Sequence, residues 1–150
     1  MFDRKELIVI ACSKSKRKGG AGEYSPSPLA DLLSEDRFRQ LMKARKNISE
    51  ILNLSPGPDL GTSAADEKIL FLPAYQRYSG IVYKENDFDQ VYPGIASRKV
   101  IIISALYGVL DASEFIRNYE LKMDHKLPIG VRVTTWWKNC LLYTSDAADE

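Results

Sequence analysis

The chain has 150 residues, of which 45% are hydrophobic and 27% charged, and its formal net charge is +1. This length suits one domain with one core, and these proportions are those of an ordinary globular protein rather than a disordered or fibrous one. No apolar run approaches the roughly 20 residues that cross a bilayer, and the N-terminus carries acidic residues and lacks the long apolar core of a secretory signal. Two distant cysteines, Cys12 and Cys140, do not suggest a disulfide framework, so we expect a cytoplasmic protein with no membrane partner.

The charge is unevenly distributed along the chain. Residues 1–46 hold 11 Lys or Arg against 6 Asp or Glu, whereas the remainder holds 10 against 14. Separated blocks of charge can create a local field that attracts phosphates, although a basic helix face balanced by acidic loops explains the same counts. We favour the second explanation for most of these charges, but not for those near Lys14.

The last ten residues, LLYTSDAADE, resemble a translated sequencing adapter. We therefore expect one domain over residues 1–140 and a non-native tail over residues 141–150. Without that tail, which holds three acids and no base, the net charge is +4. We expect the natural protein to continue with a different sequence, so that this domain is an incomplete copy of a larger fold.

The first element expected is a strand that leads into a polar loop. Residues 6–12, ELIVIAC, form a continuous apolar run with β-branched side chains, which predicts a buried strand. Residues 13–28 are rich in polar residues, glycine and proline, which predicts a loop.

A helical region follows this loop. Ser27 followed by Pro28 is typical of a helix start. Apolar residues recur mostly at helical spacing over residues 29–54, which predicts one or two helices with a break near Ser34. Residues 55–66 contain two prolines and two glycines and predict a loop.

The second half alternates less clearly between helix and strand. Residues 68–84 predict extended pieces or a short helix, and residues 86–97 a helix. Residues 99–106, KVIIISAL, are the clearest strand in the chain. We expect a short helix over residues 112–118 and a short extended segment over residues 119–123.

This order of elements favours an α/β fold, with a mixed sheet flanked by helices in a single domain. Both of the clearest strands end in small or polar residues. In an open α/β sheet, ligands gather at the carboxyl ends of strands. We therefore expect the loop after Cys12 and the loop after Ala105 to form two sides of one cleft.

The loop after Cys12 carries four cations followed by glycines, namely Lys14, Lys16, Arg17 and Lys18. Lysines beside a flexible backbone can hold an anion. The loop lacks the G-x-x-x-x-G-K-[ST] pattern of a nucleotide-binding P-loop, so a solvated basic loop is an equal alternative. Nearby cations stabilise a thiolate at Cys12, but a small buried strand residue is the interpretation that we favour.

Residues 73–84 interleave aromatic side chains with cations, and include Tyr75, Arg77, Tyr78, Gly80, Tyr83 and Lys84. Such a pattern suits stacking on bases and contact with phosphates, although half-buried structural tyrosines are the commoner case. His125 is the single histidine, and no C-x-x-C or H-x-x-x-H pattern occurs. We therefore predict no metal site and no cofactor.

Many polar residues lie at the end of the 99–106 strand and directly after it. Gly108 permits a tight turn, and Ser104 and Tyr107 can then present hydroxyl groups at the edge of the sheet. Three carboxylates and two counter-charges follow, namely Asp111, Glu114, Glu120, Arg117 and Lys122. Crowded carboxylates can act as acids or bases, but capping and salt-bridge roles are more common.

Several segments together resemble the peroxide-stress protein YaaA family. Residues 104–123, SALYGVLDASEFIRNYELKM, are similar to the family's S-G-L-Y-G-V-L turn and P-Y-x-L-x-M segment. RYSGIVYK, residues 77–84, is similar to F-x-G-D-V-Y, and CSKS, residues 12–15, is similar to part of S-P-A-K-T. TTWW, residues 134–137, is similar to the aromatic segment that follows. The resemblance covers most of residues 7–138.

The chain also departs from the family pattern. Asp111-Ala112 stands where the family has Arg-Pro, and Glu120 and Lys122 exchange the signs of the family's two charges. The N-terminal ACSKSKR segment is closer to a small sister family. The resemblance places the family's lysine at Lys14.

The resemblance implies a cytoplasmic α/β protein that limits peroxide damage to DNA and binds DNA through a basic cleft. The family is also associated with lower free iron, but this sequence offers no ligand set for that metal. In this interpretation six cations contact phosphates, namely Lys14, Lys16, Arg17, Lys18, Arg77 and Lys84. Tyr78, Tyr83 and Tyr107 then line the cleft.

The alternative is an enzyme that acts on a nucleotide or nucleobase at a glycosidic bond. Lys14 would hold a phosphate, and the catalytic candidates are Ser104, Tyr107, Asp111 and Glu120. The ligand-binding residues expected under the two interpretations are Cys12, Ser13, Lys14, Lys16, Arg77, Tyr78, Gly80, Tyr83, Ser104, Tyr107, Gly108 and Tyr119. The expected partner is thus DNA or a nucleotide, and the sequence indicates no oligomeric state.

Overall fold

The computed structural model describes residues 7–62, 68–95 and 99–140, so the expected tail over residues 141–150 lies outside the described part. In chain order the elements are β1 (Leu7–Ala11), α1 (Leu29–Leu32), α2 (Glu35–Ile51), the 3₁₀ helix η2 (Pro58–Leu60), β2 (Phe71–Pro73), α3 (Ala74–Arg77), α4 (Ile81–Glu85), α5 (Phe88–Ile95), β3 (Lys99–Ser104), β4 (Gly108–Asp111) and β5 (Phe115–Arg117). Residues 133–140 are also helical. No helix in these ranges is both long enough and apolar enough to cross a bilayer.

The strands form a mixed three-stranded sheet and a separate two-stranded sheet. In the larger sheet the order is β1-β3-β4, with β1 parallel to β3 and β4 antiparallel to β3. The register pairs Leu7 with Lys99 and Ala11 with Ile103. In the smaller sheet β2 pairs with β5 in the antiparallel sense. The predicted α/β class with a mixed sheet is therefore confirmed.

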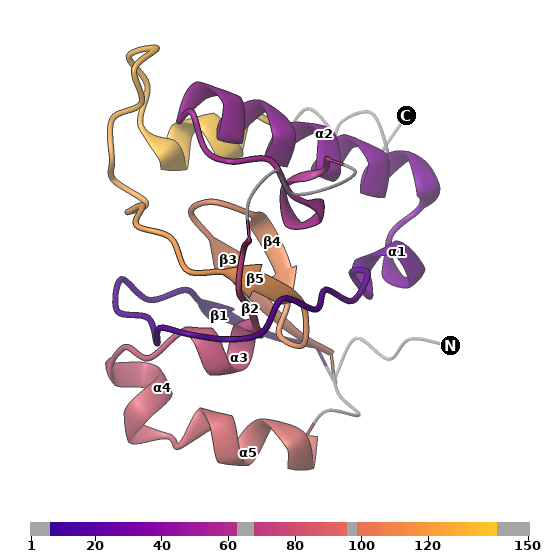
Figure 1. Ribbon diagram of the computed structural model, residues 1–150, viewed down its shortest axis with the longest axis vertical. Helices are drawn as coiled ribbons and strands as arrows, with labels where there is room; N and C mark the ends of the chain where they lie inside the picture. Colours follow the sequence, from indigo (N-terminus) through magenta and orange to yellow (C-terminus); the bar gives the residue numbers. More distant parts are fainter. Residues whose placement is uncertain (1–6, 63–67, 96–98, 141–150) are drawn as a thin grey trace.

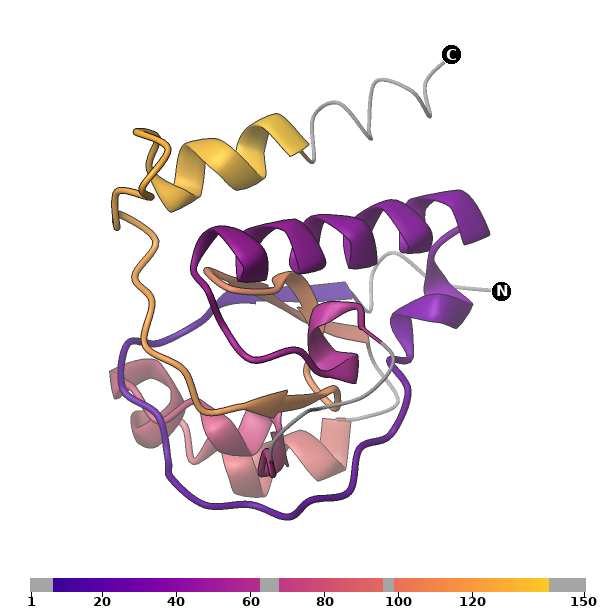
Figure 2. The same cartoon turned by 45° about the horizontal axis from the view of Figure 1, so that its top comes forward.

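The larger sheet lies between two helical layers (Figures 1 and 2). Helix α2 covers one side, and α3, α4 and α5 cover the other. The central strand β3 buries Val100 and Ile102 almost completely. A strand that is apolar on both faces belongs in such a central position, as the KVIIIS run predicts.

Strand β1 was expected to be buried, and this expectation is wrong. Its residues alternate between exposed and half-buried, and Leu7 and Val9 are 41% and 55% exposed. Among the described residues β1 pairs with β3 alone, so it is an edge strand. Ile8 and Ile10 pack against the core, whereas the opposite face of the strand has no such cover. A continuous apolar run cannot by itself distinguish these two positions.

The helical region after residue 27 divides where the sequence indicates. The Ser27 hydroxyl accepts a hydrogen bond from the Leu29 backbone N–H at the start of α1. Ser34 caps α2 by accepting from the Arg37 N–H, 3.2 Å away, which satisfies one of the free donors of the first turn. The predicted break near Ser34 is therefore confirmed.

The helix expected over residues 112–118 is wrong. Residues 115–117 form β5 and pair with β2, and residues 108–111 form β4 and pair with β3. The antiparallel pairing of β5 with β2 thus replaces the expected helix. Pairing partners far away in sequence decide the conformation of such short segments, and local spacing does not reveal them.

Candidate functional site

The carboxyl ends of β1 and β3 meet at one edge of the sheet. The backbone N–H of Cys12 donates to the Ile103 carbonyl at 2.9 Å, which continues the parallel pairing beyond β1. Ser104, the last residue of β3, therefore lies next to the start of the loop that follows Cys12. The expectation that the two loops come together is met by this geometry.

Three hydroxyl groups gather at this edge and form what we call the hydroxyl cluster, Tyr78, Ser104 and Tyr119. The two tyrosine oxygens are 2.7 Å apart, and Ser104 Oγ lies 3.2 Å from Tyr78 Oη and 3.1 Å from Tyr119 Oη. All three side chains are buried. Burial raises the pKa of both tyrosines above the ordinary value, so both remain protonated near neutral pH.

The ammonium group of Lys16 covers the hydroxyl cluster. Its Nζ atom lies 4.1 Å from the centroid of the Tyr119 ring and 5.8 Å from that of Tyr78, within the range of cation–π attraction. It also donates to the Lys14 carbonyl at 3.1 Å. Burial lowers the pKa of Lys16, and the nearby Cys12 and Glu120 oppose that shift.

The space between the two loops is therefore filled rather than open. The rings of Tyr78 and Tyr119 and the side chain of Lys16 occupy the place where the sequence predicts a cleft. This corrects the expected basic cleft to a basic surface above a packed aromatic layer. Large aromatic side chains close such gaps because interiors pack to high density.

Local contacts fasten the loop after β1 to this layer. The Tyr83 hydroxyl donates to the Ala11 carbonyl at 2.6 Å. Ser13 Oγ accepts from the Ser79 N–H at 3.2 Å. A Cβ atom placed on Gly80 would lie 2.6 Å from that of Ser13, so the close approach requires glycine.

Arg77 has a structural position rather than an exposed one. Its side chain is fully buried, and its two terminal nitrogens donate to four backbone carbonyls, those of Arg17, Gly19, Leu70 and Ile116. Burial lowers the pKa of its guanidinium group. Because these donors hold the 17–19 loop against β2 and β5, Arg77 is not placed to contact a phosphate.

Tyr107 and Gly108 belong to a different network, on the α2 side. The Tyr107 hydroxyl donates to Asp59 Oδ2 at 2.6 Å, and Arg117 Nε donates to the same oxygen at 2.7 Å. Gly108 has φ of +75° and lies against the Trp137 ring. Thus the structure does not bring Tyr107 to the surface near Lys14, although the Tyr107 ring contacts that of Tyr119 with centroids 5.7 Å apart.

A buried ion pair between Arg45 and Glu114 completes this network. Both side chains are inaccessible to solvent, and Arg45 also donates to the carbonyls of Tyr107 and Val109 at 3.0 and 2.7 Å. Asp111, a catalytic candidate, instead accepts from the backbone and hydroxyl of Ser113. These carboxylates therefore stabilise turns and ion pairs.

Sequence reasoning missed Arg45 and Asp59. One signal for Arg45 was present, because it lies four residues after Leu41 and three before Ile48, on the buried stripe of α2. A charged residue on such a stripe indicates a buried partner. Asp59 lies in the predicted 55–66 loop, where nothing in the sequence distinguishes it from an exposed turn residue.

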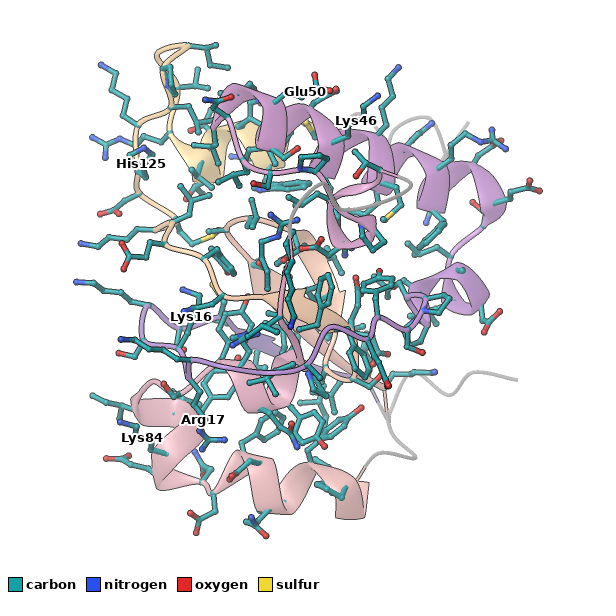
Figure 3. All side chains as sticks on the ribbon, in the orientation of Figure 1. Lys16, Arg17, Lys46, Glu50, Lys84 and His125 are labelled. Carbon is teal, nitrogen blue, oxygen red and sulfur yellow. The ribbon has the colours of Figure 1, made fainter. Side chains whose placement is uncertain are left out.

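The surface beside the hydroxyl cluster is basic. Lys16, Arg17, Lys84 and His125 point toward the same side of the molecule in Figure 3. Arg17 pairs with Asp89 at 3.2 Å, whereas Lys16 and Lys84 form no ion pair with a carboxylate of the described residues. We call this surface, formed by Lys16, Arg17, Lys84 and the segment around His125, the basic edge.

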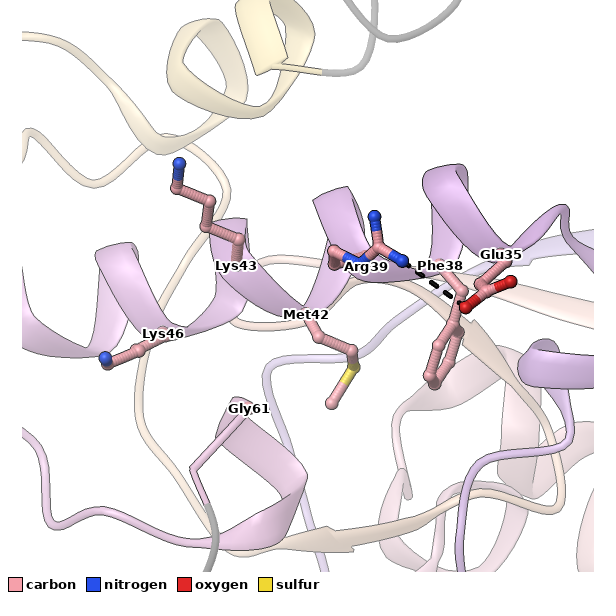
Figure 4. A pocket seen from close by; sticks show the side chains of 7 residues that line it. All are labelled: Glu35, Phe38, Arg39, Met42, Lys43, Lys46 and Gly61. Carbon is pink, nitrogen blue, oxygen red and sulfur yellow. Dashed lines mark hydrogen bonds and ion pairs between the residues drawn. The ribbon is translucent and has the colours of Figure 1, made fainter.

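An open hollow of about 460 Å³ lies elsewhere, along α2 (Figure 4). Its lining residues are Glu35, Phe38, Arg39, Met42, Lys43, Lys46 and Gly61. Arg39 is paired there with Glu35 and Asp36. None of the residues singled out in the sequence lines this hollow, and its charges are partly neutralised.

The described residues contain no cluster of three or more His, Cys, Asp or Glu side chains able to hold a metal ion. The groups of the basic edge that could contact a ligand include ammonium groups and tyrosine rings. Ammonium groups favour phosphates, and aromatic faces favour cations or stacked bases.

Comparison with known proteins places the chain in a family. The family model described as peroxide stress protein YaaA matches residues 7–145. A UPF0246 protein of Corynebacterium efficiens is 33% identical over 143 residues, which cover 86% of this chain and 55% of that protein. A UPF0246 protein of Corynebacterium glutamicum is 32% identical over 136 residues, covering 81% of this chain and 53% of that protein. A UPF0246 protein of Fusobacterium nucleatum is 25% identical over 150 residues, which cover 60% of its length.

The chain thus spans little more than half the length of these relatives. The match to the family model includes both loops of the site, the hydroxyl cluster and the segment around His125. The chain belongs to the peroxide stress protein YaaA family.

Proposed function

We propose that this protein acts in the response to peroxide stress by binding DNA along the basic edge and so limiting oxidative damage to it. The family name supports the stress role. The basic edge supports the choice of DNA, because clustered cations attract a polyanion, and Arg17 is the member of this cluster that pairs with a carboxylate of the described residues. We place this function in the cytoplasm.

The observation that carries the proposal is the position of Lys16. Its ammonium group lies over two buried tyrosine rings, so the charge is held in one place at the surface. A fixed cation loses less conformational entropy on contacting a phosphate than a free lysine does. The hydroxyl cluster thus serves as the support of a phosphate contact rather than as a catalytic centre.

The test is the affinity for a duplex of about 20 base pairs, measured by fluorescence anisotropy at several salt concentrations. Each lost phosphate contact lowers the slope of log affinity against log salt by about 0.9. Lys16→Gln and Lys84→Gln are each expected to lower the slope by about that amount. Lys46→Gln is the matched control, since Lys46 lies on α2 and faces Glu50 at 4.0 Å. An unmodified chain that does not bind at low salt would refute the proposal.

A second candidate is an enzyme that acts on a nucleotide. The observation in its favour is the set of three hydroxyl groups beside an amine with a lowered pKa, at the carboxyl end of β3. This function needs the 13–18 loop to open, because these groups are buried. Saturable binding of a mononucleotide that Ser104→Ala abolishes, with duplex affinity unchanged, would favour the enzyme over the DNA-binding protein.

A further inference from the structure

Residues 123–134 form a hairpin that projects from the body of the molecule (Figures 1 and 2). Backbone hydrogen bonds join its two arms, from Val133 N–H to the His125 carbonyl at 2.9 Å and from Thr134 N–H to the Met123 carbonyl at 2.9 Å. We call this segment the 123–134 hairpin. Its arms are anchored by Leu127 and Val133, whose side chains are buried in the core.

The tip of this hairpin is a rigid turn. The Gly130 N–H donates to the Leu127 carbonyl at 2.8 Å, and the Leu127 N–H donates to the Val131 carbonyl at 2.7 Å. Pro128 takes the second position of the turn, and Gly130 has φ of +95°. This is the three-residue hairpin loop in which a left-handed glycine closes a turn. The remaining tip residue, Ile129, is therefore held in a defined direction.

The backbone conformation of the turn does not require an isoleucine at this tip. The loop needs Pro128 and Gly130 for their backbone angles, but the position between them is ordinarily polar. Ile129 is 59% exposed. Within residues 122–132 there are three Lys or Arg against one Asp, and Lys126 and Arg132 face each other across the arms as a bridge pair. The tip is thus an apolar point between exposed cations.

Proteins that bend DNA use this combination. They insert an apolar side chain between base pairs from the minor groove, while flanking cations hold the phosphates. The 123–134 hairpin also continues the basic edge, because His125 lies on the same side as Lys16 and Lys84 (Figure 3).

We propose that the 123–134 hairpin is a DNA-distorting element, in which Ile129 enters the minor groove of a duplex and Lys126 and Arg132 contact the flanking phosphates. This inference rests on the proposed function and specifies its ligand as duplex DNA that can be kinked. Flexible pyrimidine–purine steps such as TA are the expected insertion sites, because they unstack at least cost.

The test compares Ile129→Ser with Ile129→Leu, on a 20-base-pair duplex labelled at both ends for energy transfer. The unmodified chain should bend the duplex by at least about 20°. Ile129→Ser should abolish that bend and lower the affinity for a duplex with a central TA step by roughly tenfold, with the salt slope unchanged. Ile129→Leu should restore both, and Lys126→Gln should lower the slope by about 0.9. Ile129 is exposed, so the thermal midpoints of these variants should match.

The outcomes separate this inference from the function on which it rests. If the unmodified chain binds the duplex and Ile129→Ser bends and binds it equally well, the hairpin proposal is overturned while DNA binding stands. If Ile129→Ser weakens binding to vesicles of anionic lipid and leaves duplex binding unchanged, the tip serves a membrane surface and the proposal fails. If no duplex binding occurs at any salt concentration, both proposals fail.

Discussion

The ammonium group of Lys16 lies 4.1 Å from the centroid of the Tyr119 ring. This contact joins the loop after β1 to the segment after β5, which are about 100 residues apart in the sequence. It fixes a cation at the surface directly above three buried hydroxyl groups. The stability of that buried layer and the charge above it can be tested separately.

Alkaline pH should destabilise the fold through its buried tyrosines. Burial raises the pKa of Tyr24 to about 12 and holds the pKa values of Tyr78, Tyr107 and Tyr119 above the ordinary value. Below pH 10 these groups are protonated in both states. As the pH rises from 10 through about 12, the unfolded chain ionises first and the free energy of unfolding falls. Lys16 acts in the opposite direction, because burial lowers its pKa.

Denaturant unfolding at pH 9, 10 and 11, combined with the tyrosinate absorbance at 295 nm, measures this effect. Tyr24→Phe should lose less stability over the same range. An equal loss in Tyr24→Phe and the unmodified chain would show that Tyr24 does not contribute.

Separating the buried pair of Arg45 and Glu114 should cost about 3–5 kcal/mol. Arg45→Met leaves the Glu114 carboxylate without a counter-charge inside the core. Glu114→Gln likewise leaves the Arg45 guanidinium without a counter-charge. The double variant should lose less than the sum of the two single losses, because neither charge then remains alone. Chemical denaturation of the four chains gives the coupling energy.

The exposed pair of Arg39 and Glu35 provides the control for that cycle. Its removal should change the free energy of unfolding by less than about 1 kcal/mol. Additive single losses at Arg45 and Glu114 would contradict the description of these two residues as a coupled buried pair.

Arg77→Met should destabilise the protein by at least about 3 kcal/mol. The substitution keeps most of the side-chain volume but leaves four backbone carbonyls without their donor, each at a cost of roughly 1–3 kcal/mol if it stays buried. The 17–19 loop should then become sensitive to trypsin, since it contains Arg17 and Lys18. Limited proteolysis that cuts the unmodified chain and Arg77→Met at the same rate in this loop would disprove the clamp role of Arg77.

Gly108→Ala should be one of the most damaging small substitutions. A Cβ atom there would lie 2.5 Å from the Trp137 ring, at a backbone φ of +75°. The combined strain and overpacking should cost roughly 2–5 kcal/mol and shift the tryptophan fluorescence. Gly22→Ala is the matched control, because a Cβ atom on Gly22 meets no atom within 4 Å and its φ is ordinary. Equal stability of the two variants would contradict the packing described for Gly108.

Parts of this fold follow from local sequence signals. The break at Ser34 follows from a capping residue placed before an amphipathic run, and the strand β3 follows from a short apolar run of β-branched residues. β4 and β5 could not be foreseen, because their conformation depends on pairing with β3 and β2. Exposure of β1 likewise depends on which neighbours cover it.

The sequence predicted several residues of the candidate site but not their arrangement in space. Sequence reasoning named Lys16, Tyr78, Ser104 and Tyr119, which the structure brings together. It also grouped Tyr107 and Asp111 with them, but Tyr107 donates to Asp59 on the α2 side and Asp111 accepts from Ser113. Spacing along a chain does not reveal which side of a sheet a turn presents, and it gave no indication that aromatic rings fill the expected cleft.

If DNA binds along the basic edge, the residues of that edge form the bound surface, and nuclear magnetic resonance can map it. We expect amide chemical shifts to change, on titration with a short duplex, in residues 13–18, around Lys84 and in the 123–134 hairpin. Amides along the exposed face of α2 near Lys43 and Lys46 should not change. Shifts confined to α2 and its hollow, with none in the 13–18 loop, would rule out DNA binding along the basic edge.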